Sequence, residues 1–178
     1  MNTSASRSAH IVLIGMMGVG KSTVGRRVAK ELARPFVDSD DEVVARTGRA
    51  VTEIFATDGE PAFRAIEEDV MADLLASPTP SVIAAAGGSV LSSTTRARLR
   101  ESGTVVWMRA PVDVLVGRTS RGTHRPALAN DPRATLTQME TDRESLYSEV
   151  ADITVDCTAP IVAVVGAIVR SVADGGGQ

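Results

Sequence analysis

The segment from Gly15 to Ser22, which reads G-M-M-G-V-G-K-S, constrains the fold of this chain more than any other part of the sequence. An apolar run at 11–14 precedes it, and Val24, Val28 and Leu32 follow it at helical spacing. The pattern G-x-x-x-x-G-K-[ST] binds phosphate when it joins a strand to a helix, because the loop N–H groups and the helix dipole then face the anion. A glycine-rich turn with a chance Lys-Ser pair is the alternative, but the whole pattern and both flanks agree. The segment therefore predicts binding of a nucleoside triphosphate.

Two side chains at the end of this loop have expected roles in phosphate chemistry. Lys21 can place a positive charge on the β- and γ-phosphates, and the Ser22 hydroxyl can ligate Mg²⁺. The glycines allow backbone N–H groups to turn inward around the phosphates without a clash from Cβ. The nucleotide-binding residues that we expect in the loop are Gly18, Val19, Gly20, Lys21, Ser22 and Thr23.

The bulk composition favours one globular domain over residues 1–178, with a folded core at about 10–172 and frayed tails. Hydrophobic residues make up 43% of the chain and charged residues 23%, which argues against wholesale disorder. The net charge of −3 gives no electrostatic reason to expect nucleic acid or an anionic membrane as a partner. We expect a monomer whose ligands are small molecules.

The cysteine content and the first apolar run bear on localisation. Cys157 is the single cysteine and has no partner for an internal disulfide, which suits a reducing cytosol. The apolar run near the start of the chain ends in Gly-Lys-Ser-Thr and not in a small-residue cleavage site, which argues against a signal peptide. No other stretch is long and apolar enough to span a bilayer. We therefore expect a cytoplasmic protein.

Short apolar strands alternate with amphipathic helices along the chain, which is typical of a parallel α/β sheet. The alternation predicts an α/β fold with three layers, α/β/α, around a central parallel sheet of about five strands. The expected strands are 11–14, 35–37, 81–86, 105–108 and 153–155, and the expected helices are 24–32, 41–46, 63–74, 96–100 and 161–172.

The arginine-rich stretch at about 119–134 follows neither the helical nor the strand period and is predicted to be a mobile lid. It holds Arg121, Arg125 and Arg133, and Arg118 lies just before it. Phosphoryl transfer needs water to be excluded and negative charge to be neutralised, and a closing basic segment does both. A solvated basic loop is the alternative. The Arg125-Pro126 step is the sharper signal, because proline holds the preceding backbone extended.

Asp38 and Asp40 follow the second expected strand, at the edge of the sheet where ligands of open α/β folds bind. Asp38 can hold Mg²⁺ directly or through water. Asp40 can accept a proton or a hydrogen bond from an acceptor hydroxyl. The alternative is that Asp40 is only the N-cap of a helix beginning at Asp41.

Two arginines and a glycine pair are candidates for the acceptor side. Arg64 and Arg143 can each grip a carboxylate in a bidentate manner. Each also has glutamates nearby in sequence, so a helical salt bridge is the alternative. Gly87 and Gly88 end a buried strand and permit close approach of a ligand to the backbone, or serve as a plain turn.

Together these residues resemble the shikimate kinase family, within the nucleoside-monophosphate-kinase-like branch of P-loop proteins. The resemblance runs from about residue 11 to residue 170 in the family's order. The matching pieces are Gly-x-x-Gly-x-Gly-Lys-Ser-Thr-x-Gly-Arg at 15–26, Asp-Ser-Asp at 38–40, Arg-Thr-Gly-Arg at 46–49, Ile-Phe-x-x-x-Gly-Glu-x-x-Phe-Arg-x-x-Glu at 54–67, Gly-Gly-Ser-Val at 87–90, Arg-Pro at 125–126 and Arg-x-x-Leu-Tyr at 143–147.

The resemblance implies the P-loop NTPase fold and ATP-dependent phosphorylation of the 3-hydroxyl of shikimate, in aromatic amino-acid biosynthesis. It implies ATP and Mg²⁺ as cofactors. The roles that it implies are Lys21, Asp40 and Arg125 in catalysis, Arg118 and Arg125 at the nucleotide, Ser22 and Asp38 at the metal, and Asp40, Arg64, Gly87, Gly88 and Arg143 at shikimate.

Four departures from the family pattern bear on affinity and on the choice of acceptor. Ala86 stands where the family usually has a glycine, Ala127 replaces a leucine, and Ser145 replaces a proline. The usual basic contact to adenine is absent from 157–160. A kinase for another polyol acid, such as gluconate, is one alternative. A nucleotide-binding regulatory module without turnover is the other, although the charged candidates Lys21 and Asp40 are intact.

Overall fold

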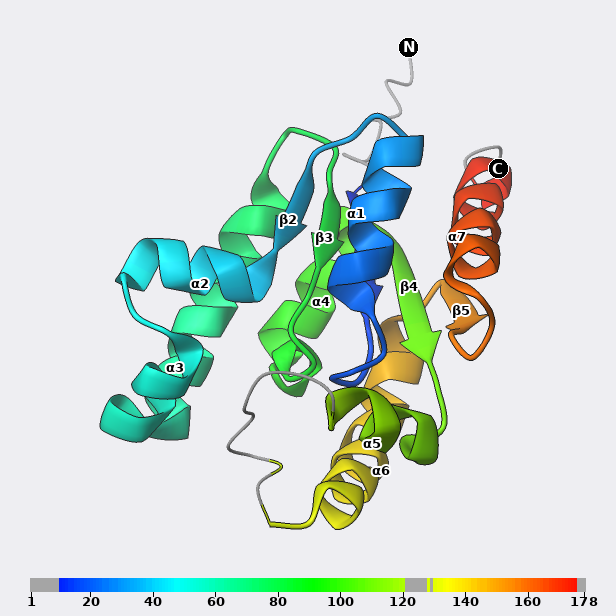
Figure 1. Ribbon diagram of the computed structural model, residues 1–178. Helices are drawn as coiled ribbons and strands as arrows, with labels where there is room; N and C mark the ends of the chain where they lie inside the picture. Colours follow the sequence, from blue (N-terminus) through cyan, green and yellow to red (C-terminus); the bar gives the residue numbers. More distant parts are fainter. Residues whose placement is uncertain (1–9, 121–127, 129, 176–178) are drawn as a thin grey trace.

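The protein is described by a computed structural model that covers residues 10–120, 128 and 130–175 (Figure 1). Its centre is a five-stranded sheet with the order β2-β3-β1-β4-β5, in which every pair of neighbours is parallel. The predicted α/β fold and the parallel sheet are confirmed. The strands are β1 His10–Ile14, β2 Phe36–Asp38, β3 Val82–Ala84, β4 Gly103–Arg109 and β5 Ile153–Asp156.

Helices form a layer on each face of the sheet and enclose its carboxyl end. Figure 1 shows α1 in front of the sheet and α4 behind it, with α2 and α3 beyond the β2 edge. The same view places α5 and α6 below the carboxyl ends of the strands, while α7 packs beside α1. The helices are α1 Lys21–Glu31, α2 Ser39–Thr47, α3 Val51–Ala76, α4 Ser93–Ser102, α5 Val112–Thr119, α6 Pro132–Val150 and α7 Ile161–Gly175, with a 3₁₀ turn, η1, at Ser89–Leu91.

Two hydrophobic clusters stabilise this arrangement. The larger one is built on β1, in which every residue is at most 1% exposed, and it includes the inner faces of the other strands and of α1 and α7. The second cluster lies between α2 and α3 and consists of Val43, Ile54, Phe63 and Val70. The helices at the β2 edge therefore have a small core of their own. Among the described residues, no helix is long and apolar enough to cross a membrane.

The third strand is shorter than the predicted 81–86, because β3 ends at Ala84. Its neighbour β2 also ends there, with Asp38 paired to Ala84. Beyond this point the backbone of Ala86 has a different partner, since its N–H donates to the Ser39 hydroxyl at 2.9 Å. The end of β3 is thus a turn held by the tip of β2.

The second helix begins earlier than the predicted Asp41, because α2 starts at Ser39. Its N-cap is Asp38, whose carboxylate accepts a hydrogen bond from the Asp40 N–H at 3.1 Å. The alternative that made Asp40 the N-cap is therefore wrong. The helix ends at Gly48, as predicted, with that residue in the left-handed conformation.

Helices α5 and α6 were not predicted, and the expected lid at 119–134 was too long at both ends. Thr119 is the last residue of α5, and residues 132–134 form the first turn of α6. A usable signal was present in the sequence. Pro132 stands at the start of the helix, and the Asp131 carboxylate caps it by accepting from the Ala134 N–H at 3.0 Å.

Helix α3 is broken at Gly59, which has φ 82° and ψ 171°. Only glycine adopts this conformation readily, and Pro61 follows it at a position where a new helix can begin. The second part of α3 therefore leaves in its own direction, and it carries Phe63 into the small cluster. The break, and not a continuous helix, determines where the side chains after residue 60 point.

We expect Gly59→Ala to lower the free energy of unfolding by about 1–3 kcal/mol, because alanine is strained at this φ and ψ. An added Cβ meets nothing closer than Pro61 Cδ at 3.7 Å, so the loss is conformational and not steric. Urea unfolding with an unchanged m-value measures it.

Gly117→Ala is the matched control, since Gly117 lies in α5 with open space around its Cβ position. It should be neutral or stabilise by up to about 1 kcal/mol. Equal midpoints for the two variants would contradict the strained break.

Candidate active site

The loop between β1 and α1 has the geometry of a phosphate site. Gly20 precedes α1 in a left-handed conformation, and no side chain caps the helix, so its first N–H groups face the loop. Gly18 also has a positive φ, while Val19 is buried beneath the loop. Lys21 Nζ donates to the Gly15 carbonyl at 2.7 Å and to the Met16 carbonyl at 3.1 Å. Its ammonium group therefore lies over the middle of the loop.

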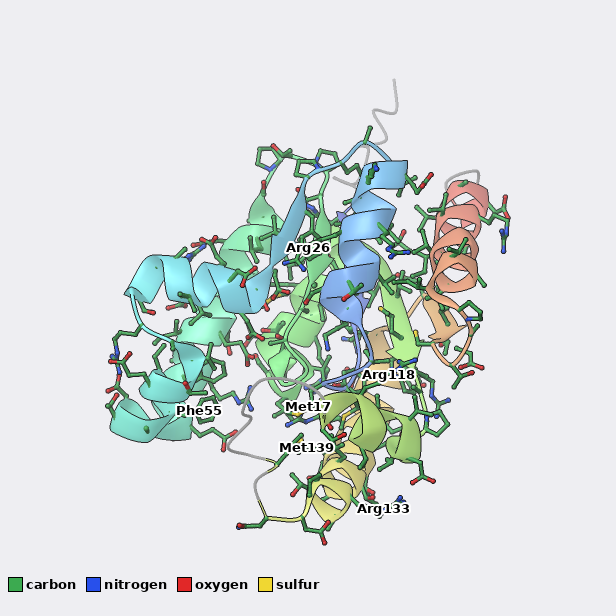
Figure 2. The ribbon with its side chains drawn as sticks, in the orientation of Figure 1. Met17, Arg26, Phe55, Arg118, Arg133 and Met139 are labelled. Atoms are coloured by element: carbon green, nitrogen blue, oxygen red, sulfur yellow. The ribbon has the colours of Figure 1, made fainter. Side chains whose placement is uncertain are left out.

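Arg118 connects this loop to the far side of the sheet (Figure 2). Its guanidinium donates to the Val19 carbonyl at 3.3 Å and to the Cys157 carbonyl at 2.7 Å. Cys157 follows β5, so one side chain joins the phosphate loop to the β5–α7 connection. Thr23 is exposed in the first turn of α1. Every loop residue predicted at the nucleotide thus lies at the carboxyl end of β1 or in the turn that follows.

Ser22 and Asp38 meet across the gap between α1 and β2. The Ser22 hydroxyl donates to Asp38 Oδ2 at 2.5 Å. Mg²⁺ in nucleotide sites is bound by one or two protein oxygens together with phosphates and water. The two adjacent oxygens, one of them a half-buried carboxylate, suit that mode. Among the described residues, no group of three or more His, Cys, Asp or Glu side chains forms a separate metal site.

Asp40 is exposed in the first turn of α2, next to this pair. Ser39 lies between the two aspartates and is fully buried, because its hydroxyl binds the backbone of the β3 turn. Asp38 and Asp40 therefore face the site from one strand end while Ser39 points inward. A carboxyl group at this edge of the sheet can accept a hydrogen bond from a hydroxyl group.

Arg64 lies in the second part of α3 and is held by two carboxylates. It pairs with Glu60 at 3.0 Å and with Glu67 at 2.8 Å. The guanidinium also covers Gly88, where the Cβ of any other residue would fall only 2.6 Å from Arg64 Cζ. The predicted salt bridge is therefore present, and the arginine also approaches the glycine pair.

Glu67 was not assigned a role from the sequence, yet it lies in the middle of the charged groups. It is only 3% exposed, and burial raises the pKa of its carboxyl, while the Arg64 charge lowers it. The charges of Asp40 and Arg143 also reach it. Its Oε1 atom has no hydrogen-bond partner among the described residues. The spacing of Arg64 and Glu67, three residues apart, could have indicated their ion pair. It could not have indicated that the Glu67 side chain is buried.

Arg143 is buried in α6. Among the described residues it forms no salt bridge with the neighbouring glutamates, so that alternative is wrong. Glu144 pairs with Arg109 at 2.7 Å instead. A Cβ on Gly87 would lie 3.6 Å from Arg143 Nη1, and that arginine is only 8% exposed. Arg64 and Arg143 therefore converge on the two consecutive glycines from opposite helices.

A cavity of about 500 Å³ opens beside this convergence, between α3 and α4. Arg64, Glu67 and Gly88 line its inner side, and Ser89 and Leu91 line the turn that follows. The Ser89 hydroxyl is buried and has no hydrogen-bond partner among the described residues. Asp40 and Arg143 do not line this cavity, so it adjoins the site and does not coincide with it.

The remaining predicted residues have mixed outcomes. Arg125, Arg121 and Ala127 lie outside the described residues, as do the predicted frayed ends at 1–9 and 175–178, except that Gly175 is the last residue of α7. Arg133 is described, and it forms an ion pair with Asp113 of α5. Of the departures from the family pattern, Ala86 is half-buried in the β3 turn and Ser145 is exposed on α6.

A five-stranded parallel sheet of this order, with a phosphate loop after its central strand and two arginines facing it, defines a P-loop phosphotransferase. A family model described as shikimate kinase matches residues 17–173. The shikimate kinase of Caulobacter vibrioides is 47% identical over 144 residues, which cover 80% of this chain and 72% of that protein.

Solved structures agree with these matches. A shikimate kinase from Acinetobacter baumannii in complex with shikimate superimposes with a TM-score of 0.91 at 33% identity, over 96% of each chain. A gluconokinase from Sinorhizobium meliloti superimposes with a TM-score of only 0.62 at 23% identity, over 96% of this chain and 94% of that one, and shares the fold alone.

The chain belongs to the shikimate kinase family. The resemblance read from the sequence is thereby confirmed, and so is the prediction of an ATP-dependent phosphotransferase.

We expect the Cys157 thiol to react slowly with the disulfide reagent DTNB in the native protein at pH 8. Burial raises the pKa of this thiol to about 11, and the thiolate is the reactive form. At pH 8 the thiolate population falls about a hundredfold relative to a thiol with a pKa of 9.0. The protein unfolded in urea is the control and should react at the ordinary rate. Equal native and unfolded rates would contradict the burial.

Proposed function

We propose that this protein transfers the γ-phosphoryl group of ATP to the 3-hydroxyl of shikimate. The observation that carries the proposal is the convergence of Arg64 and Arg143 on Gly87 and Gly88, beside the start of the phosphate loop. Two guanidinium groups suit one carboxylate, and Asp40 suits a neutral hydroxyl. An acceptor that already carried a phosphate would be repelled by the carboxylate of Asp40. A hydroxyl-rich acid meets all of these groups favourably.

The nucleotide lies, in this proposal, along the P-loop. The N–H groups from Gly18 to Thr23 hold the phosphates, and Lys21 places its charge on the β- and γ-phosphates. Arg118 flanks the adenine while it joins the loop to the chain after β5. The Arg118 contacts support this, because they put the guanidinium at the edge of the loop.

The acceptor acid lies, in this proposal, between α3 and α6. Arg64 and Arg143 hold its carboxylate, and the N–H groups of Gly87 and Gly88 meet the ring hydroxyls. Asp40 accepts the proton of the attacking hydroxyl as phosphoryl transfer proceeds. Arg125 neutralises the charge that develops on the transferred group, as the family pattern implies.

Ser22 and Asp38 would hold Mg²⁺, which would neutralise negative charge on the phosphates of the nucleotide. The 2.5 Å contact between their oxygens supports the assignment, since both ligands are already at one point. Asp38 also caps α2 through its other oxygen, so the position of the metal ligand is tied to the helix that carries Asp40.

Three further assignments belong to the same proposal. The protein acts as a single-domain monomer, with the segment between α5 and α6, residues 120–131, as its lid. It works in the cytoplasm, where ATP is supplied. The gluconate alternative has the weaker support, because the gluconokinase shares only the fold at 23% identity. Membership of an enzyme family disfavours the inactive regulatory module.

The direct test is ADP release from Mg·ATP by the purified protein, with shikimate, quinate, gluconate or no acceptor. We expect turnover with shikimate alone. Lys21→Ala is the control, because loss of the ammonium charge should abolish turnover without removing the fold. Turnover with gluconate but not with shikimate would overturn the choice of acceptor. No turnover with any acid would overturn the kinase proposal.

We expect Asp40→Asn to lower kcat about a hundredfold or more, because the amide accepts no proton from the hydroxyl. Asp41→Asn is the matched control, since Asp41 is the next residue of α2 and its side chain is 76% exposed, 3.8 Å from Arg26. The control should keep kcat within about twofold. Steady-state kinetics with saturating shikimate and ATP measures both. If Asp40→Asn retained the wild-type rate, Asp40 would not act as the base.

A further inference from the structure

Tyr147 is the single tyrosine of the chain, and it lies buried between the phosphate loop and the acceptor site. Its ring stacks on Trp107 with centroids 5.8 Å apart, so the orientation of the phenol is set by the main core. Its hydroxyl donates to the Gly87 carbonyl at 2.7 Å and lies 3.9 Å from the sulfur of Met16. The phenol thus joins α6 to the glycine turn through a hydrogen bond of normal length.

Arg143 lies one helical turn earlier on α6, and its guanidinium reaches the same place beside Gly87 as the phenol. Burial raises the pKa of Tyr147 to about 12, while the Arg143 charge lowers it. The phenol therefore stays neutral and donates to the Gly87 carbonyl at any ordinary pH. A Cβ on Gly87 would lie 3.5 Å from this hydroxyl and 3.6 Å from Arg143 Nη1. All three groups thus meet at one point.

We propose that Tyr147 is a positioning residue for the acceptor acid, because its hydroxyl binds the Gly87 carbonyl at the point that the Arg143 guanidinium also reaches. Arg143 is then aimed by Tyr147 and not by a neighbouring glutamate, since Glu144 is engaged by Arg109. With the Gly87 carbonyl turned toward the phenol, the N–H side of the glycine pair faces the acceptor. The inference rests on the proposed function and assigns a residue to which that proposal gives no role.

The test is Tyr147→Phe in the full-length protein, with steady-state kinetics in each substrate. Phenylalanine keeps the ring against Trp107 and removes only the hydroxyl. We expect the KM for shikimate to rise about tenfold and the KM for ATP to change less than about twofold. The reason is that the lost hydroxyl positions only the groups proposed to bind the acceptor. In an Arg143→Ala background the same substitution should add little to the KM for shikimate, since it acts through Arg143.

Ser102→Ala is the matched control. The Ser102 hydroxyl is buried and donates to the Leu99 carbonyl at 3.0 Å, at the end of α4 where β4 begins. Its loss should lower thermal stability and leave both KM values unchanged. A Tyr147→Phe variant that behaves in the same way, or that adds its full effect in the Arg143→Ala background, overturns the proposal.

A second measurement uses the wild-type protein and does not depend on the variant folding. Ring-labelled tyrosine gives NMR signals from Tyr147 alone, because the chain has one tyrosine. Saturating shikimate should shift these signals, and an unchanged spectrum overturns the proposal. If the wild-type protein does not turn over shikimate at all, the proposed function fails, and the positioning role fails with it. Wild-type turnover with an unchanged KM in Tyr147→Phe overturns the positioning role alone.

Discussion

Strand β1 is hydrogen-bonded on both edges, to β3 and to β4, and none of its residues is more than 1% exposed. The position of Ile14 at the end of β1 is therefore fixed relative to the sheet. The phosphate loop begins at the next residue, so its position is fixed as well. The neighbouring strand ends supply the rest of the site. Asp38 ends β2, and the glycine turn follows β3 level with the loop. Every group proposed for catalysis and described by the structure depends on this burial, since a shift of β1 would move all of them relative to the phosphates.

The acceptor side has a different foundation. Asp40 and Arg64 are carried by α2 and α3, whose contact is a small cluster of four buried residues separate from the main core. Arg143, by contrast, projects from α6, which packs on the main core through Leu136 and Tyr147. The second part of α3 also reaches the main core, through Met71 and Leu75. The proposed carboxylate clamp therefore joins arginines from two helices that are both packed against the sheet.

Local patterns predicted the loop between β1 and α1 and the turn after β2, because each is encoded within a few positions of sequence. The five strands were recognisable for the same reason, since buried parallel strands read as short apolar runs. Contacts across the chain were not predictable. The burial of Glu67 and the contact of Tyr147 with Gly87 depend on how α3 and α6 cross the sheet. Helix α6 also has no strong apolar stripe from which it could have been predicted. Arg125, expected at the transferred phosphate, stays a prediction.

The two carboxylates that hold Arg64 differ in one property that bears on selectivity. Glu67 is only 3% exposed, at the inner side of the cavity, whereas the Glu60 side chain is 60% exposed. If Arg64 binds the acceptor as proposed, Glu60 is the counter-ion that an incoming acid can replace, because one carboxylate is exchanged for another while the displaced one is hydrated. A neutral polyol offers no such exchange and would leave the ion pair with Glu60 intact. The exposed ion pair would then favour anions over uncharged sugars at this position.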